Sequence, residues 1–459
     1  MIRRDQALFR FGELIFSYPP FNFLKGIFGA YFIYPIAEKY EKRKVNPKLV
    51  SLRRYYKLNV EDRLELNKKK LVDTLKLAGS EVPYYRDLFK QQNFIPDKVL
   101  GDLRYLEELP YLDKQIILEQ GPRLLSRPLD QVRYHVRKTG GSTGQSAVIY
   151  YNQEGIDYTA ACMLYARERV GKPRFKSEIH FACEFPGDVS PSWPTREDIK
   201  GLAMNRSNIF FGRLDALGLE KILQTLIRRK PYLVHAHPST FYALACYVEG
   251  YYKKAVKLCS IFESSGELLQ PYMREKIQEV LNCQVVDRFG LAESGLVAYE
   301  LSGAGTGLQV LDSECWPESR LNSDGSHELV LTNFRNSLMP LIRYATGDCA
   351  KVVKTDKGFM LSDVVGRIHD IVPINGIPHP THHIMDILDH RVGGIQEFQI
   401  DLRAEHPILR IVLAKGANQG EVSSKIEHYW PRAFKVEFVG HDSFIYVGHR
   451  AKFRHVVTG

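Results

Sequence analysis

The sequence predicts an α/β protein with a large N-terminal domain of layered sheets and helices, followed by a small C-terminal α+β domain. The 459 residues are enough for two or three compact units with their own cores. The 44% hydrophobic and 25% charged residues lie in the ordinary globular range, which excludes wholesale disorder. The central part alternates short apolar runs with amphipathic segments, and this alternation is typical of layered α/β folds.

The first 60 residues are expected to form an N-terminal arm that is apolar and basic. From residue 14 to residue 37 the only charge is Lys25, yet prolines interrupt the stretch and its charge-free runs are too short to span a bilayer singly. We expect the arm to pack on the body of the protein. The alternative is a peripheral membrane contact through residues 14–37, in which basic side chains face lipid headgroups, namely Arg3, Arg4, Arg10 and Lys25.

Residues 61–365 are expected to form the large domain. Leucines at helical spacing predict a helix over 60–80 and another over 219–227. The alternating part predicts strands at Leu233–His235, Lys257–Phe262, Gln284–Val286 and Glu328–Leu331, and helices at Tyr242–Gly250 and Pro271–Leu281.

The pattern changes after about residue 366, so residues 366–459 are expected to form the small domain. The pattern of apolar residues in this part predicts paired strands at Gln396–Leu402 and Leu409–Lys415, a helix at Gly420–Trp430 and a further strand at Lys435–Val439.

The net charge of +10 suits anionic partners but does not choose among them. The basic runs Lys68–Lys70 and Arg228–Lys230 have no interleaved aromatic residues and are expected on solvated helix faces, so nucleic acid is not an expected partner. Seven scattered cysteines without a CxxC pair favour reduced thiols in a cytoplasmic protein.

A glycine- and hydroxyl-rich segment follows Lys138. Such a loop can point backbone N–H groups at an anion, but it lacks the Gly-Lys-Ser/Thr ending of a Walker loop. By itself it is equally compatible with a phosphate cradle and with a plain turn. Its residues are Thr139, Gly140, Gly141, Ser142, Thr143 and Gly144.

Further along the chain, an aromatic ring and a carboxylate follow a predicted strand. Phe289 could stack on a purine and Glu293 could hold Mg²⁺ against phosphates. Asp348 is the last residue of the segment Pro340–Asp348, and its carboxylate could accept hydrogen bonds from two ribose hydroxyls. A basic segment, Ala451–Val457, lies near the C-terminus.

Together these segments resemble the adenylate-forming superfamily of acyl-CoA synthetases, and most closely its phenylacetate–CoA ligase and CapK-like branch. The resemblance covers roughly residues 80–459 and rests on the order and spacing of several motifs. They are Thr139–Gly144, Asp287–Glu293, Pro340–Asp348, Gly366–Asp370 and Ala451–Val457. Three further segments have sequences that resemble this branch, at Val82–Arg86, Leu109–Lys114 and Ser265–Glu267.

The resemblance implies a role for each matching position. The loop Thr139–Gly144 would wrap the β- and γ-phosphates of ATP, Phe289 would flank the adenine, and Asp287 and Gly290 would also bind ATP. Asp348 would hold the ribose with help from Arg367, and Asp370 would be the hinge about which the small, mobile C-terminal domain turns. Glu293 would bind Mg²⁺ and Lys452 would be the mobile catalytic lysine. His235 and Glu267 would line the acyl pocket, with helix capping as the alternative for Glu267.

The expected activity is therefore the ATP-dependent conversion of a carboxylic acid to an acyl-adenylate, with release of pyrophosphate. The acyl group would then pass to CoA or to an amine, as in polysaccharide biosynthesis, with which CapK-like proteins are associated. ATP, Mg²⁺ and CoA are the implied cofactors and substrates. The alternative is a nucleotide-binding scaffold or sensor that kept the fold without turnover. This alternative is motivated by two positions at which the sequence departs from the family pattern, Ala451 and His369.

Overall fold

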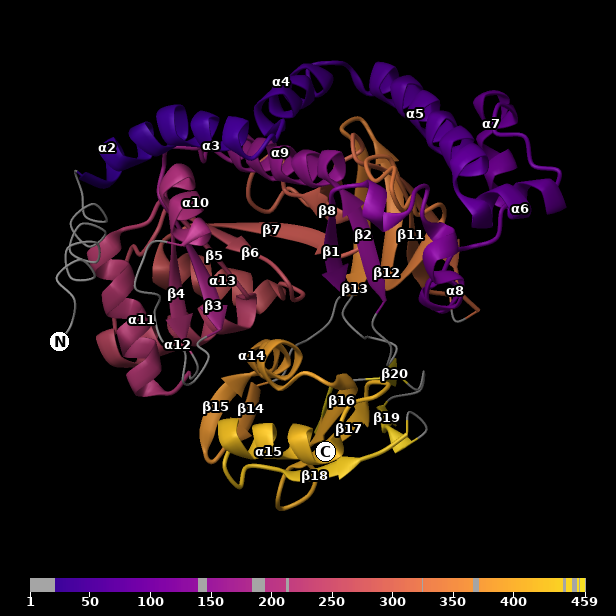
Figure 1. The fold of residues 1–459 in the computed structure, drawn as a ribbon. Helices are drawn as coiled ribbons and strands as arrows, with labels where there is room; N and C mark the ends of the chain where they lie inside the picture. The colour runs from indigo at the N-terminus through magenta and orange to yellow at the C-terminus, as the bar shows by residue number, and fades with distance from the viewer. Residues whose placement is uncertain are drawn as a thin grey trace.

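A single twisted sheet organises most of the chain (Figure 1). The computed structural model describes residues 21–138, 147–183, 195–211, 214–323, 325–365, 371–440, 443–447, 452–453 and 455–458. Within them the large sheet has eleven strands in the order β10-β11-β12-β13-β9-β8-β7-β6-β5-β3-β4. The predicted α/β class is confirmed.

One half of this sheet is parallel and is covered by helices. Its strands are β3 (Glu178–Cys183), β4 (Arg206–Phe211), β5 (Leu233–Ala236), β6 (Ile261–Ser264) and β7 (Gln284–Leu291). The associated helices are α9 (Gln153–Arg169), α10 (Arg196–Met204), α11 (Ala216–Arg229), α12 (Pro238–Tyr252) and α13 (Pro271–Leu281).

The other half is antiparallel. It comprises β8 (Gly295–Tyr299), β9 (Leu308–Val310), β10 (Cys315–Leu321), β11 (His327–Asn333), β12 (Tyr344–Thr355) and β13 (Gly358–Val365). Strand β7 joins the halves, because its residues 284–287 pair with the parallel β6 and its residues 288–291 pair with the antiparallel β8. A separate hairpin consists of β1 (Tyr134–Lys138) and β2 (Val148–Asn152).

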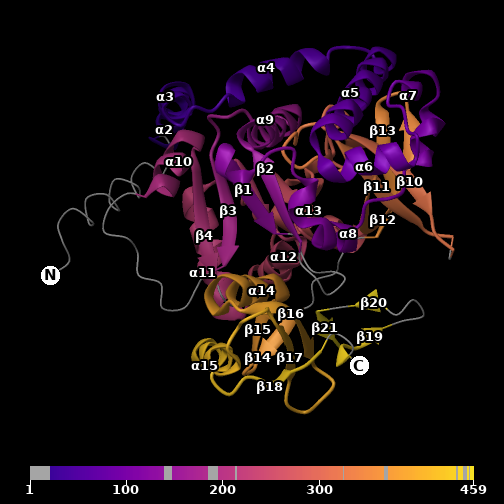
Figure 2. The same ribbon diagram turned by 45° about the vertical axis from the view of Figure 1, so that its right-hand side comes forward.

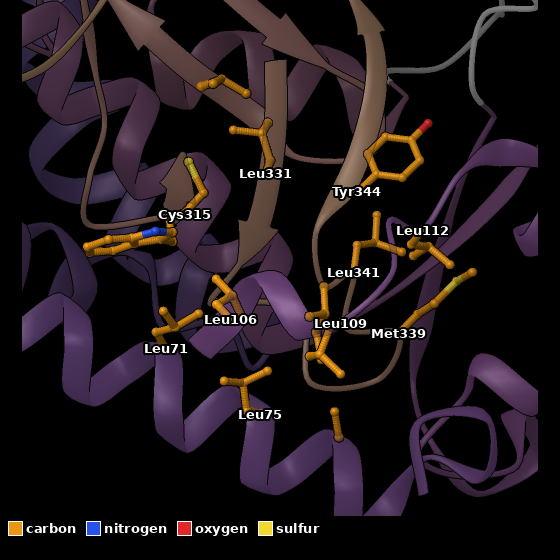
Figure 3. Close-up of a cluster of buried hydrophobic side chains, with 14 of the residues drawn as sticks. Leu71, Leu75, Leu106, Leu109, Leu112, Cys315, Leu331, Met339, Leu341 and Tyr344 are labelled. Atoms are coloured by element: carbon orange, nitrogen blue, oxygen red, sulfur yellow. The ribbon is translucent and has the colours of Figure 1, made fainter. Parts of the chain in front are cut away.

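A long helix and several short ones pack on the antiparallel half. They are α5 (Val60–Glu81), α6 (Pro83–Gln91), α7 (Lys98–Gly101) and α8 (Lys114–Gln120), with 3₁₀ turns η2 (Leu103–Glu108), η3 (Gly121–Leu124) and η4 (Leu129–Gln131). Figure 3 shows Leu71 and Leu75 of α5 beside Leu106 and Leu109, facing strand residues such as Leu331. The leucine spacing that predicts this helix thus buries its apolar stripe on the sheet.

The first described segment is a nearly continuous helical run. It consists of α2 (Phe21–Phe28), the π-helical turn η1 (Gly29–Ile33) and α3 (Tyr34–Tyr40), followed by α4 (Val45–Tyr55). The end of the predicted arm belongs to the body, because Val45, Leu49 and Leu52 of α4 share a core with α9. None of the helices in the described residues is both long and apolar enough to cross a membrane.

The last part of the chain has its own hydrophobic core, drawn from residues 372–456. Its strands are β14 (Ile371–Ile374), β15 (Ile377–Pro380), β16 (Ile395–Asp401), β17 (Ile408–Leu413), β18 (Lys435–Phe438), β19 (Tyr446–Val447), β20 (Lys452–Phe453) and β21 (Val456–Val457), and its helices are α14 (Thr381–Ile387), η5 (Leu388–Val392) and α15 (Gln419–Tyr429). It touches the large unit where Leu214 N donates to Pro378 O (3.0 Å) and where the rings of Phe211 and His383 lie 4.1 Å apart. The boundary predicted at Gly366 falls in residues 366–370, outside the described residues.

Two local expectations were wrong. The strand predicted at Lys257–Phe262 begins only at Ile261, because residues 257–260 approach the sheet as a loop whose Ser260 N bonds to Tyr232 O. Lys70 does not lie on a solvated face. Its ammonium group sits 4.2 Å above the Tyr55 ring, and burial lowers its pKa to about 8.

Candidate active site

A pocket opens where β7 meets the antiparallel half of the sheet. Among the described residues it is lined from five sequence regions, at Gly266–Leu268, at Asp287–Glu293, at Leu308, at Thr346 and Asp348, and at Val364. It therefore brings together Glu267, Asp287, Phe289, Gly290, Glu293 and Asp348, residues that are up to 81 positions apart in the chain and were all singled out from sequence.

Glu293 lies in the tight turn between β7 and β8 and is held there by three strands. Its Oε1 accepts a hydrogen bond from the Tyr344 hydroxyl (2.8 Å), and its backbone oxygen accepts one from Asn333 Nδ2 (3.0 Å). The neighbouring Ala292 O accepts from the Tyr151 hydroxyl on β2 (3.0 Å). Glu293 is only 5% exposed, so its carboxylate is fixed at the pocket wall with one oxygen already oriented.

Asp348 enters the pocket from β12. Its backbone N–H donates to Thr346 Oγ1 (3.1 Å), and the Thr346 hydroxyl donates to Leu329 O (2.8 Å). Gly347 between them has a φ of +77°, a conformation that glycine adopts without strain. This short irregular stretch interrupts the regular ladder and presents Asp348 beside Glu293.

Asp287 ends the part of β7 that pairs with β6. Its Oδ1 accepts a hydrogen bond from the Arg288 N–H (2.8 Å). Burial nevertheless raises the pKa of Asp287 to about 6, and the nearby Glu300 carboxylate adds to the rise.

This raised pKa predicts a pH-dependent stability. A carboxyl group whose pKa is higher in the folded than in the unfolded state destabilises the fold as it ionises, so its effect grows as the pH rises from 4 through 6. We expect Asp287→Asn to raise the free energy of unfolding by up to about 3 kcal/mol at pH 7 and to change it little at pH 4. Urea unfolding of both proteins at the two pH values measures this. A gain of equal size at both pH values would contradict the assignment.

Glu267 reaches the pocket from the loop after β6 and also caps a helix. Its two carboxylate oxygens accept hydrogen bonds from the Ser239 N–H (3.1 Å) and hydroxyl (2.9 Å), at the start of α12. The capping alternative is thus correct in kind, but the helix is α12 rather than the one after Pro271. Gly266 has a φ of +85° and packs so closely on His237 that a Cβ would lie 2.4 Å from the ring. His237 is therefore the histidine beside this part of the pocket.

The structure places His235 away from the described pocket lining. Its Nδ1 lies 2.8 Å from Glu263 Oε2, on the sheet face that α9 covers. There Arg167 of α9 forms ion pairs with Glu263 (2.7 Å) and Glu178 (3.0 Å), and the Tyr299 hydroxyl donates to Glu263 (2.8 Å). The role of His235 in an acyl pocket stays a prediction.

The charges of this buried cluster are set by their neighbours. Burial acts to raise the pKa of Glu263, but Arg167 and His235 outweigh it and hold the pKa well below its usual range. Burial lowers the pKa of His235, and it lowers the pKa of the adjacent His180 to about 3, so both imidazoles are neutral at physiological pH.

Several predicted site residues lie outside the described residues. They are the whole loop Thr139, Gly140, Gly141, Ser142, Thr143 and Gly144, together with Arg367 and Asp370. The loop's flanking residues Lys138 and Val148 are paired in the β1–β2 hairpin. For Lys452 the backbone alone is described. It lies in β20, paired with β19, on the side of the C-terminal unit that faces the large unit (Figures 1 and 2).

Sequence reasoning missed the residues that orient the carboxylates. Tyr344 stands in the quoted segment Pro340–Asp348 but was given no role, although it holds Glu293. His237 was passed over in favour of His235. Residues two apart on a strand share a face only while the strand continues, and β5 ends at Ala236, so His235 and His237 do not share one.

The chain is similar in sequence to known CoA ligases and to protein CapK. No family model matches the chain. The chain is 26% identical to phenylacetate–coenzyme A ligase of Escherichia coli (strain K12) over 345 residues, which covers 70% of this chain and 74% of the relative. It is 19% identical to protein CapK of Staphylococcus aureus over 322 residues, 68% of this chain and 69% of that protein.

The fold has a solved counterpart. The structure of 2-hydroxyisobutyryl-CoA ligase in complex with 2-HIB-AMP and CoA matches with a TM-score of 0.55 at 20% identity, over 87% of this chain and 90% of that one. At this identity the match shows the fold alone, which is that of adenylate-forming CoA ligases. The chain is therefore similar in sequence to phenylacetate–coenzyme A ligase and to CapK, and it has the fold of adenylate-forming CoA ligases.

Proposed function

We propose that this protein is an adenylate-forming ligase that activates a carboxylic acid with ATP and then transfers the acyl group to CoA or to an amine. The observation that carries the proposal is the single pocket shared by Phe289, Glu293 and Asp348. A ring on β7 that can stack on a purine, a carboxylate in the β7–β8 turn that can bind a metal, and a carboxylate on β12 that can bind a ribose are the parts that ATP needs. The sequence similarity to phenylacetate–coenzyme A ligase supports the same conclusion.

In the first step a carboxylate oxygen of the substrate attacks the α-phosphorus of ATP, and pyrophosphate leaves. Asp348 would fix the ribose and Phe289 would flank the adenine, so that the α-phosphate is held in line with the acid. Lys452 would neutralise the charge that develops between the two anions. In the second step a thiol or amine attacks the acyl carbonyl and AMP leaves, which is the stage for which a domain movement about Asp370 is expected.

The residues present fit a magnesium ion. Mg²⁺ takes oxygen ligands and is usually bound through one or two carboxylates plus substrate phosphates. Glu293 offers such a carboxylate, oriented by Tyr344, at the wall of the pocket. When bound there, the ion would screen the charge of the phosphates of ATP.

The acceptor is the finer part of the proposal. Similarity to phenylacetate–coenzyme A ligase favours CoA, whereas similarity to CapK keeps an amine acceptor in polysaccharide biosynthesis open. To distinguish the two acceptors, CoA or hydroxylamine is added to the enzyme together with its acid and ATP. Formation of a thioester with CoA, with only slow formation of a hydroxamate with hydroxylamine, would assign CoA as the acceptor.

The test of the first step is ATP–pyrophosphate exchange with separate pools of aryl, fatty, amino and uronic acids. We expect exchange with one pool, and a loss of at least about a hundredfold in Lys452→Ala, because the lysine charge acts mainly on the transition state. The matched control is Lys435→Ala in the same C-terminal unit, since Lys435 is exposed and pairs only with Glu437 among the described residues. Binding of ATP without exchange in any pool, and without exchange when a cell extract supplies the carboxylic acid, would instead support the scaffold alternative.

A further inference from the structure

The helical run over residues 21–40 presents an apolar ridge that the proposed function does not use. Eight large hydrophobic side chains on it are more than a third exposed, among 24 such side chains in all the described residues. They are Phe21, Phe23, Leu24, Phe28, Tyr31, Phe32, Ile36 and Tyr40. Leu24, Phe28, Phe32 and Ile36 recur every four residues, so they form one stripe along the helix.

The opposite side of the same run is fixed to the body. Gly26 and Gly29 are buried and approach the backbone so closely that an added Cβ would lie 1.9 Å from Phe175 O and 2.3 Å from Leu202 O. Asn205 Nδ2 donates to the backbone oxygen of Asn22 (3.2 Å). The glycines thus bring the helix against α10, and this leaves the aromatic side facing outward.

The segment that carries the apolar ridge and the segment after it hold an excess of positive charge, although Arg43, Lys48 and Arg53 form ion pairs with acids of α9. Residues 21–60 hold nine Lys and Arg but only two Asp and Glu, so seven of the ten net positive charges of the chain lie here. Lys39, Lys42, Lys44 and Arg54 are exposed. Directly beside α2, a polar hollow is lined by the cations Lys25, Arg206 and Arg229.

We infer that residues 21–44 bind the protein peripherally to an anionic lipid surface. Exposed Phe, Tyr, Leu and Ile on one side of a helix insert into the boundary between headgroups and acyl chains, and flanking lysines attract anionic headgroups. The apolar side chains form a convex ridge on one helix, a shape that enters a soft surface rather than receiving a partner's side chain. The run lies on the far side of the large unit from the C-terminal unit (Figures 1 and 2), so membrane contact leaves the pocket accessible.

The test is co-sedimentation of the full chain with vesicles of phosphatidylcholine, with and without phosphatidylglycerol. We expect sedimentation with the anionic vesicles, and much less with phosphatidylcholine alone or at high salt. Phe28→Ser/Phe32→Ser should weaken binding by about tenfold or more, because burial of each ring in the bilayer contributes at least that factor. Lys39→Glu/Lys42→Glu should weaken binding to the anionic vesicles only.

Matched controls separate this site from general surface effects. Leu217→Ser/Leu321→Ser removes two exposed apolar side chains elsewhere, and Lys69→Glu/Lys90→Glu reverses two exposed charges elsewhere; both should bind like the unaltered protein. All four variants change exposed side chains, and thermal melting verifies that each is folded. The inference is overturned if no vesicle sediments the protein, or if the ridge variants bind as well as the controls. It is likewise overturned if light scattering shows a dimer that Phe28→Ser/Phe32→Ser dissociates while vesicles remain unbound.

Discussion

Glu293→Gln should lower ATP–pyrophosphate exchange by about a hundredfold to a thousandfold while the protein stays folded, since a group that stabilises transition-state charge in a closed site commonly contributes that much. The amide keeps an oxygen to accept the Tyr344 hydroxyl, so the local packing is preserved while the negative charge is lost. The Mg²⁺ concentration needed for half-maximal exchange should rise as well. Exchange assays over a range of MgCl₂ measure both effects.

Tyr344→Phe is the informative partner of this change. It keeps the carboxylate but removes the donor that orients it, so we expect a much smaller loss of exchange and an unchanged Mg²⁺ requirement. If Glu293→Gln kept a third or more of the exchange, or if Tyr344→Phe were the more damaging variant, the metal-binding role of Glu293 would be wrong.

Arg167→Met should destabilise the protein by about 3–5 kcal/mol at neutral pH, the range observed when one partner of a buried ion pair is removed. Arg167 is 3% exposed and serves two buried carboxylates, Glu178 and Glu263. Without it, burial would no longer be offset and the pKa of both carboxyl groups would rise. The deficit should therefore shrink as the pH falls, because protonation removes the buried charges.

Urea unfolding at pH 7.5 and at pH 5 tests this prediction. The control is Arg53→Met, which breaks the ion pair with Glu168 at a position where the arginine is 49% exposed. An exposed pair of this kind contributes less than about 1 kcal/mol, with little dependence on pH in this range. A similar small loss for Arg167→Met would show that the buried cluster does not stabilise the fold.

The sequence was most informative where a pattern reports directly on local structure. The helix predicted at Pro271–Leu281 has those bounds in the structure, because a proline at its first turn and apolar residues at helical spacing specify it locally. Three of the four strands of the C-terminal sheet, β16, β17 and β18, were likewise placed to within two residues, since their alternation and turns are local signals, whereas β21 was not predicted.

What the sequence could not predict depends on partners that are distant in the chain. His237, not His235, lies beside Gly266 and Glu267, because β5 ends at Ala236. The sequence of one strand does not show where that strand ends and where the next helix begins. Tyr344 and Glu293 are 51 positions apart, so their hydrogen bond follows only from the register of β12 beside the β7–β8 turn. The exposed side of residues 21–40 was equally hidden, because an apolar run gives no indication of which face the body covers.

Strand β7 pairs in parallel with β6 and antiparallel with β8, and this change of pairing also separates the two halves of the sheet in time during synthesis. Residues up to Leu291 supply the parallel half of the sheet, whereas Glu293, Thr346 and Asp348 emerge from the ribosome later, with the antiparallel half. The parallel strands depend on long crossovers and pair slowly, while the later hairpins form from local contacts. A nascent chain that ends before residue 348 therefore carries Asp287 and Phe289 without the carboxylate that is expected to hold the ribose.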